Sequence, residues 1–275
     1  TINFELKDYD KAFENYKKSV ELEPDKAINQ YHLALACEKK TDIKSAIHGY
    51  IKAISIDPEN TYAIRNMIKG YLKLGKLNDL IDKFHKKSDT EPDDKMIYFC
   101  LGIAYYYSGN MEKAREYLEK MEEENAKLSL LREYIADTYY KTGDSEKAVK
   151  IIRNLLAEEP YNAELYYKLG YYLRNIKEPW QVRESLMKVG LIKANSAIAY
   201  TAQSIVNLDS KNNKEAEKLA KLAIAQDEDF SDAYYILGQI FQANGKNKLA
   251  MKYYQKALTI DPSNLDAQKA IDGLK

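Results

Sequence analysis

The residue types that most often carry out chemistry are few in this chain and widely separated. Its three histidines, His32, His48 and His85, have no cysteine or carboxylate at the spacing of metal ligands. The two cysteines, Cys37 and Cys100, form no metal-binding framework, and we interpret them as buried free thiols. Because no glycine-rich phosphate loop is present either, the sequence predicts a protein that is not an enzyme and needs no metal or cofactor.

The overall composition argues against two further classes. Lys plus Arg and Asp plus Glu both number 42, so the formal net charge is zero, whereas nucleic-acid-binding proteins usually carry an excess of basic charge. No stretch approaches roughly 18 consecutive apolar residues, so we expect no membrane insertion. The chain starts with a polar, charged segment that lacks the features of a signal peptide, and we expect a cytoplasmic protein.

The strongest feature of the sequence is an internal repeat of 34 residues. Five prolines share one phase, because their separations are all multiples of that number: Pro24, Pro58, Pro92, Pro160 and Pro262. Counting this proline as place 32 defines seven repeats without insertion or deletion: 27–60, 61–94, 95–128, 129–162, 163–196, 197–230 and 231–264. Residues 1–26 then form a partial repeat, which predicts a piece of a longer protein, and residues 265–275 an amphipathic helix that caps the array.

Within each repeat the apolar residues predict two helices. Places 4, 7, 8 and 11 follow the i, i+3, i+4, i+7 spacing of one helix face, and places 20, 24 and 27 form a second stripe. Place 15 between them is glycine in four repeats, which suits a left-handed turn. Small residues at places 8 and 20, such as Gly170, let the first helix (helix A) and the second (helix B) approach closely. The repeat at 197–230 departs from this pattern at Gln203 and Ser204, where we expect looser packing or a bend.

The last repeat resembles the tetratricopeptide repeat place for place. The matching residues are Tyr234, Leu237, Gly238, Phe241, Ala250, Tyr254, Ala257 and Pro262, and the resemblance extends over nearly the whole chain. It implies an all-α fold, a right-handed superhelical solenoid of antiparallel helix pairs. It also implies a protein-protein interaction scaffold, in which the A helices line a concave groove and contact a peptide or partner protein at places 2, 5, 9, 12 and 13.

These groove places hold residues that a helical core does not require. The candidate ligand-binding residues are Arg65, Lys69, Lys73, Phe99, Ile103, Tyr106, Tyr107, Glu133, Asp137, Tyr140, Tyr167, Tyr171 and Arg174. Tyrosine and arginine frequently anchor protein interfaces, and tyrosine is abundant here, at 24 residues. The alternative is that these rings only pack sideways between adjacent A helices.

The charges along the groove suggest an extended ligand that is both acidic and apolar. Arg65, Lys69 and Lys73 share one helix face, repel one another, and could bind an acidic segment or a terminal carboxylate. The aromatic residues that follow would take apolar side chains, and Glu133 and Asp137 a basic one. The alternative for the basic cluster is that a carboxylate of the chain itself, on the neighbouring A helix, offsets it.

A different class of function also fits the repeat. The chain could be a structural module that self-associates, or a spacer for a catalytic domain outside this sequence. Self-association predicts oligomers whose mass rises with concentration, whereas an adaptor that binds a peptide is expected to be monomeric.

Overall fold

The computed structural model of the protein describes residues 8–125, 128–176 and 178–274, with the backbone alone for residues 123–125. Within these ranges it contains 16 helices, α2 to α17, and no strand. The predicted all-α fold is therefore confirmed. The first seven residues of the predicted partial repeat and the last residue of the predicted cap lie outside the described residues.

Helices start in the phase that the prolines predict. The A helices are α3 (Ala27–Lys39), α5 (Thr61–Lys73), α7 (Lys95–Ser108), α9 (Ser129–Lys141), α11 (Ala163–Ile176), α13 (Ala197–Asp209) and α15 (Ser231–Ala243). The B helices are α2 (Tyr9–Leu22), α4 (Ile43–Ile56), α6 (Leu77–Thr90), α8 (Met111–Asn125), α10 (Ser145–Glu158), α12 (Pro179–Ile192), α14 (Asn213–Gln226) and α16 (Asn247–Ile260), and α17 (Leu265–Asp272) follows them. Both series repeat at 34-residue intervals, so every repeat contributes one helical hairpin.

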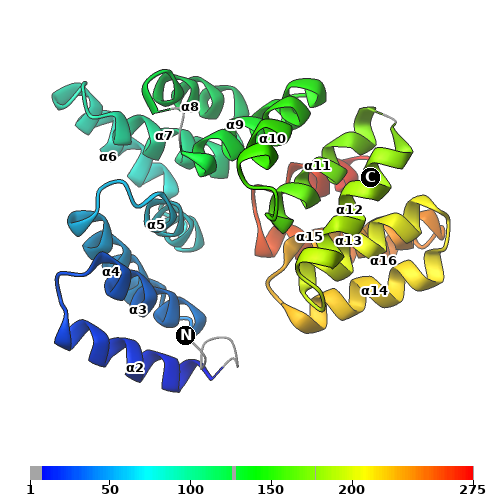
Figure 1. The fold of residues 1–275 in the computed structure, drawn as a ribbon, viewed down its shortest axis with the longest axis horizontal. Coiled ribbons are helices and arrows are strands. Elements are labelled where there is room, and N and C mark those ends of the chain that lie inside the picture. The colour runs from blue at the N-terminus through cyan, green and yellow to red at the C-terminus, as the bar shows by residue number, and fades with distance from the viewer. Residues whose placement is uncertain (1–7, 126–127, 177, 275) are drawn as a thin grey trace. The chain divides into compact units, whose positions relative to one another are not determined.

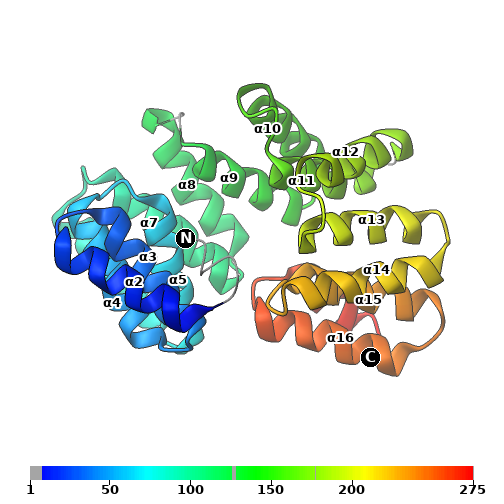
Figure 2. The same ribbon diagram turned by 60° about the horizontal axis from the view of Figure 1, so that its bottom comes forward.

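The chain forms two compact units, Thr1–Ala126 and Lys127–Lys275. The N-terminal unit holds α2 to α8 and the C-terminal unit α9 to α17. Inside each unit consecutive helices pack as antiparallel neighbours (Figures 1 and 2). Within a unit, each hairpin buries its apolar face against the next one, as expected for a repeat array.

Turn geometry explains where six of the seven A helices end. Gly75, Gly109, Gly143 and Gly245, all at place 15, have φ between 68° and 98°, the left-handed region that favours glycine. The same place in two other repeats is Thr41 (φ 65°) and Lys211 (φ 60°). The left-handed turn is therefore a property of the place, and glycine only makes it easier to adopt.

Close approach of the two helices explains the small residues at place 8. A Cβ atom added to Gly170 would lie 2.6 Å from Cγ of Leu186 on α12, and one added to Gly238 would lie 2.4 Å from the Tyr254 ring on α16. Such distances are well inside van der Waals contact, so no larger side chain fits without movement of helix B. The predicted close packing is confirmed at both places.

In the repeat at 197–230, Ser204 packs inside the core although looser packing was expected there, whereas Gln203 lies at the surface. Ser204 is fully buried, and its hydroxyl donates a hydrogen bond of 2.8 Å to the carbonyl oxygen of Ala216 on α14. The polar residue at this place is therefore satisfied inside the core. Gln203 is exposed, so its amide needs no partner in the protein.

The residues considered first for chemistry mostly have packing roles. Both cysteines are free and buried, and burial raises the pKa of the Cys100 thiol to about 12. His32 stacks on Tyr16 with ring centroids 5.2 Å apart, and His85 hydrogen-bonds the Tyr105 hydroxyl at 2.7 Å. Among the described residues no group of three or more His, Cys, Asp or Glu could hold a metal ion, and none of the helices combines the length and apolarity needed to cross a bilayer.

Candidate binding groove

The C-terminal unit brings its first and last helices together. Lys141 at the end of α9 donates a hydrogen bond of 2.7 Å from Nζ to the carbonyl oxygen of Ser263, just before α17. The Tyr171 hydroxyl on α11 donates to Oδ2 of Asp266 on α17 at 2.9 Å. The red C-terminal segment accordingly passes beside α11 in Figure 1. The A helices of this unit therefore surround a common space, which α17 helps to enclose.

That space contains a cavity of ≈ 820 Å³. Residues from α9, α11, α13, α15 and α17 line it together with the start of α12. They are Tyr140, Tyr171, Arg174, Asn175, Glu178, Pro179, Trp180, Val182, Arg183, Val206, Asp209, Ser210, Tyr235, Gln239 and Asp266. Three of the predicted groove residues, Tyr140, Tyr171 and Arg174, thus lie in one cavity wall.

Tyrosine rings in this wall also pack on one another. Tyr140 stacks on Tyr172 of the next A helix with centroids 4.4 Å apart, and lies 5.6 Å from the Tyr171 ring. Tyr167 is buried and faces Tyr171 at 6.2 Å. The sideways packing between adjacent A helices is thus present, and Tyr140 and Tyr171 combine it with a place in the cavity wall.

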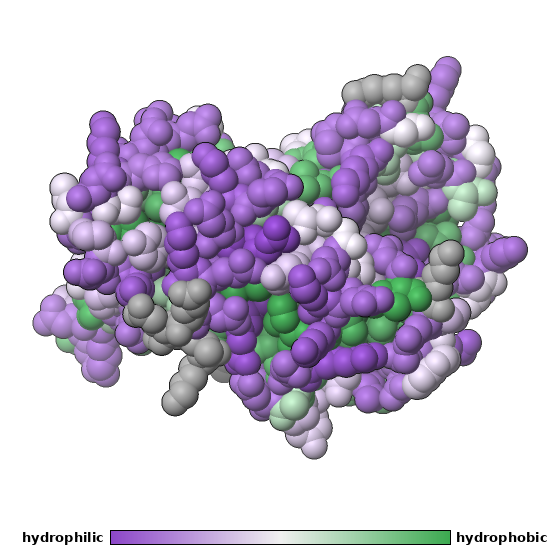
Figure 3. All heavy atoms as spheres, turned by 90° about the horizontal axis from the view of Figure 1, so that it is seen from above, coloured by the Kyte–Doolittle hydropathy of each residue, from purple (hydrophilic) through white to green (hydrophobic). Residues whose placement is uncertain are grey.

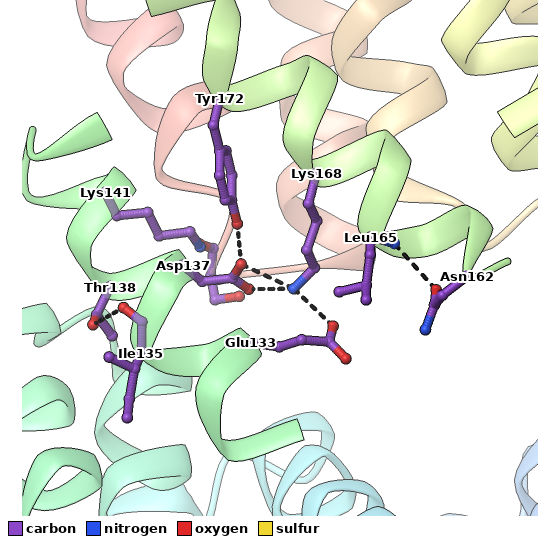
Figure 4. Close-up of polar contacts among 10 residues, drawn as sticks. Glu133, Ile135, Asp137, Thr138, Lys141, Asn162, Leu165, Lys168 and Tyr172 are labelled. Carbon is purple, nitrogen blue, oxygen red and sulfur yellow. Dashed lines mark hydrogen bonds and ion pairs between the residues drawn. The ribbon is translucent and has the colours of Figure 1, made fainter. Parts of the chain in front are cut away.

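The acidic residues at the groove places of α9 are paired with a basic residue of the chain itself. Lys168 Nζ lies 2.9 Å from both carboxylate oxygens of Asp137 and 3.2 Å from Glu133, and Tyr172 donates its hydroxyl to Asp137 (Figure 4). Burial by itself lowers the pKa of Lys168, but the two carboxylates outweigh it and hold this pKa above its ordinary value. Glu133 and Asp137 on α9 therefore form ion pairs with Lys168 on α11.

Arg174 in the cavity wall also has a partner in the next repeat. Arg174 on α11 donates from Nε at 3.2 Å and from Nη2 at 2.9 Å to the two carboxylate oxygens of Asp209 on α13. This two-point contact is the strong geometry for a guanidinium and a carboxylate. It orients Arg174 along the cavity wall.

In the N-terminal unit the predicted basic cluster is partly neutralised. Lys73 Nζ lies 2.7 Å from the Glu38 carboxylate on the neighbouring A helix, which is the alternative interpretation of this cluster. Burial alone would raise the pKa of Glu38, but hydrogen bonds from Lys73 and Tyr50 outweigh it and lower this pKa. Of the other two basic residues, Arg65 lies 5.2 Å from the centroid of the Tyr62 ring and Lys69 lies 6.0 Å from that of Tyr107.

The apolar residues predicted beside this cluster are buried. Phe99 and Ile103 have no exposed surface, and Tyr106 and Tyr107 are 7% and 8% exposed. The Tyr106 and Tyr107 rings meet edge to face with centroids 5.3 Å apart. These side chains of α7 are therefore part of the hydrophobic core of the N-terminal unit.

Several residues of the cavity could not be expected from the groove places. Trp180, 68% exposed, and Glu178 come from the start of α12, a B helix, and Asp266 comes from the cap. The signal that could have pointed to Trp180 is the Pro-Trp pair at 179–180, which departs from the repeat pattern. Asp266 had no such signal, because its position depends on the contact between α17 and α11.

Asp232, a partly buried residue at groove place 2 of α15, predicts a pH-dependent stability. Burial raises the pKa of Asp232 on α15 from 3.8 to about 6, with Asp261 and Asp266 acting in the same direction and Lys141 opposing them. Between these two pKa values the native state keeps a proton that the unfolded chain has lost, so stability falls as pH rises through this window. We expect Asp232→Asn to stabilise the protein at pH 7 by up to about 3 kcal/mol, and to have little effect near pH 4.

Melting curves of the wild-type and variant proteins at both pH values measure this difference. An equal shift of Tm at pH 4 and pH 7 would contradict a raised pKa at Asp232.

Comparison with known proteins identifies the family. A tetratricopeptide repeat profile matches residues 5–161, more than half of the chain, and a second matches residues 231–264, the last repeat. The chain therefore belongs to the tetratricopeptide repeat family, as its repeat pattern predicts.

Individual relatives are more distant. The chain is 25% identical over 261 residues to the Hsp70-Hsp90 organizing protein of Triticum aestivum, covering 90% of this chain and 43% of the relative. It is 28% identical over 184 residues to the TPR repeat-containing protein MJ1428 of Methanocaldococcus jannaschii, covering 60% and 32%. The chain thus spans less than half the length of these relatives.

Solved structures share the fold at low identity. The APC/C hetero-tetramer Cut9-Hcn1 aligns with a TM-score of 0.68 at 14% identity, covering 95% of this chain and 52% of that one. A tetratricopeptide repeat protein from Parabacteroides merdae aligns with a TM-score of 0.58 at 19% identity, covering 90% and 94%. The helical solenoid architecture is confirmed by both.

Proposed function

We propose that this protein is an interaction scaffold whose C-terminal unit holds a segment of a partner polypeptide. The observation that carries the proposal is the cavity of ≈ 820 Å³ among the A helices, with Tyr140, Tyr171, Tyr235 and the exposed Trp180 in its wall. Its size lies within the range of binding pockets, about 300–1,000 Å³. Large aromatic side chains at such places supply the contact area of protein interfaces.

The relatives support an interaction role for the family. One is named for organizing Hsp70 and Hsp90, and one solved neighbour is part of a hetero-tetramer. On the face shown in Figure 3, hydrophilic side chains predominate and hydrophobic ones gather in patches. Contact with a partner through a few apolar sites is consistent with that distribution.

The N-terminal unit enters the proposal separately. Arg65 and Lys69 on α5 would contribute to recognition of an acidic group of a partner, beside Lys73 of the same face and its ion pair with Glu38. Their positive charges lie against the Tyr62 and Tyr107 rings.

Trp180→Ala tests the cavity as the binding site. A side chain that anchors an interface typically contributes about 2 kcal/mol or more, so we expect roughly 30-fold weaker affinity for a purified partner. Because Trp180 is 68% exposed, the substitution should leave the melting curve nearly unchanged. Tyr161→Ala is the matched control, since Tyr161 is 84% exposed and does not line the cavity. Binding isotherms of the three proteins with one partner, first recovered by pull-down, give the comparison.

Other outcomes would point elsewhere. Equal affinity for wild type and Trp180→Ala would place recognition outside this cavity. Recovery that is lost on nuclease treatment would indicate nucleic acid, and a molecular mass that rises with concentration would indicate self-association.

A further inference from the structure

We infer that the cavity of the C-terminal unit receives an arginine side chain of the partner, beside the Glu178 carboxylate. The inference rests on the proposed function and specifies its ligand chemistry. Three observations support it: a carboxylate oxygen without a partner, a surplus of negative charge in the wall, and aromatic faces around the same space. This ligand differs from the acidic one that the sequence suggested. The acidic ligand was inferred from Arg65, Lys69 and Lys73 in the N-terminal unit, whereas the present inference is drawn from the residues that line the cavity of the C-terminal unit.

The first observation concerns hydrogen-bond acceptors. Among the described residues, Oε2 of Glu178 and Oε1 of Gln239 are buried and accept no hydrogen bond, and both side chains line the cavity. Gln239 uses its Nε2 to donate to the Tyr235 hydroxyl at 2.8 Å. A buried acceptor without a donor costs free energy, and more so when it is charged. A ligand that brings several N–H donors would recover that cost.

The second observation is the charge of the wall. Glu178, Asp209 and Asp266 contribute three negative charges, and Arg174 and Arg183 two positive ones. Asp209 is already paired with Arg174 through both oxygens. Asp266 accepts from Tyr171, a neutral donor that leaves its charge in place. The cavity therefore favours a cationic occupant over an acidic one.

The third observation separates arginine from lysine. Trp180, Tyr171 and Tyr235 present aromatic rings to the cavity. A planar guanidinium stacks on such rings and keeps five N–H donors in its plane, whereas an ammonium is a compact and strongly hydrated charge. An arginine side chain therefore suits a wall that combines aromatic side chains with the acceptors of Glu178 and Gln239 better than a lysine does.

The protein carries a built-in probe for this test, because Trp180 is its only tryptophan. The ligand is the peptide acetyl-Ala-Arg-Ala-amide, titrated at low salt while Trp180 fluorescence is recorded. The comparison peptides replace arginine by citrulline, which has the same shape without the charge, by lysine, or by glutamate. We expect a saturable change with the arginine peptide and at least tenfold weaker binding of the citrulline peptide. Added salt should weaken binding of the arginine peptide but not that of the uncharged citrulline peptide.

Glu178→Gln is the decisive variant. It removes the charge but no capping interaction, because Glu178 makes no side-chain hydrogen bond at the start of α12. We expect at least tenfold weaker binding of the arginine peptide and no change for citrulline. Glu184→Gln is the matched control on the same helix, since Glu184 pairs with Lys188 on the surface and does not line the cavity. It should bind as the wild type does.

The results that would overturn the inference are specific. Equal binding of arginine and citrulline peptides, unchanged binding by Glu178→Gln, or preference for the glutamate peptide would each exclude an arginine site at Glu178. Any of these can occur while Trp180→Ala still weakens partner binding, in which case the proposed function stands and only its ligand chemistry fails.

Discussion

Replacing Lys168 by methionine is expected to lower the free energy of unfolding of the C-terminal unit by about 3 kcal/mol. The substitution keeps the length of the side chain but removes the ammonium group that contacts both the Asp137 and the Glu133 carboxylates. Those side chains are only 14% and 16% exposed, so water cannot fully replace Lys168. Urea unfolding followed by circular dichroism measures the change.

Lys193→Met is the matched control for this prediction. Lys193 also forms an ion pair, a 2.8 Å contact with Glu164 of the same repeat, but both side chains are more than half exposed. Exposed pairs contribute about 0–1 kcal/mol, so this variant should unfold close to the wild type. Adding Asp137→Asn to Lys168→Met should restore part of the lost stability, because one buried charge is then removed. Equal unfolding of Lys168→Met and Lys193→Met would show that the buried pair is not a special determinant of stability.

Gly170→Leu should destabilise the same unit by about 3 kcal/mol or more, at the upper end of the range for overpacking. The first added atom would already lie 2.6 Å from Leu186 Cγ and 3.4 Å from the Leu186 backbone nitrogen. Leu186 is completely buried, so α12 has to shift away from α11 to make room. Because residues from both helices line the cavity, we also expect weaker partner binding by this variant.

A glycine on the facing helix provides the control. A Cβ atom at Gly190 would meet only the end of the Gln203 side chain, at 3.3 Å, and that exposed amide can rotate away. Gly190→Leu should therefore cost less than about 1 kcal/mol, since leucine also favours the helix over glycine. Gly170→Leu combined with Leu186→Ala should recover much of the stability by exchanging the two volumes. If Gly170→Leu and Gly190→Leu unfold alike, close approach at place 8 does not limit the fold.

The two destabilising variants act on opposite contacts of one helix, α11, for different reasons. Lys168 and Gly170 are neighbours on α11, one facing the acidic residues of α9 and the other the apolar face of α12. Charge pairing therefore aligns successive A helices, while steric fit sets the distance between helices A and B. Both place Tyr171 and Arg174, on the same helix, in the cavity wall.

The sequence by itself determined the local architecture of this protein. Helix starts, the left-handed turn at place 15 and the close contact at Gly170 all follow from interactions within 34 residues. A pattern of this kind is readable because each repeat meets the same steric demands, so the same residue types return at the same places. The family followed from that repetition.

Only the tertiary structure decided which groove residues are available to a ligand. Whether Glu133 and Asp137 face a partner depends on Lys168, which reaches them from the next repeat. The contact of Lys141 with Ser263 joins residues that are 122 positions apart in the sequence, and the contact of Tyr171 with Asp266 joins residues 95 positions apart. These contacts depend on small rotations that accumulate from one hairpin to the next. A periodic sequence pattern predicts the single hairpin but not the total rotation over several hairpins. The cavity, and the unpaired carboxylate of Glu178 within it, follow from this accumulated geometry.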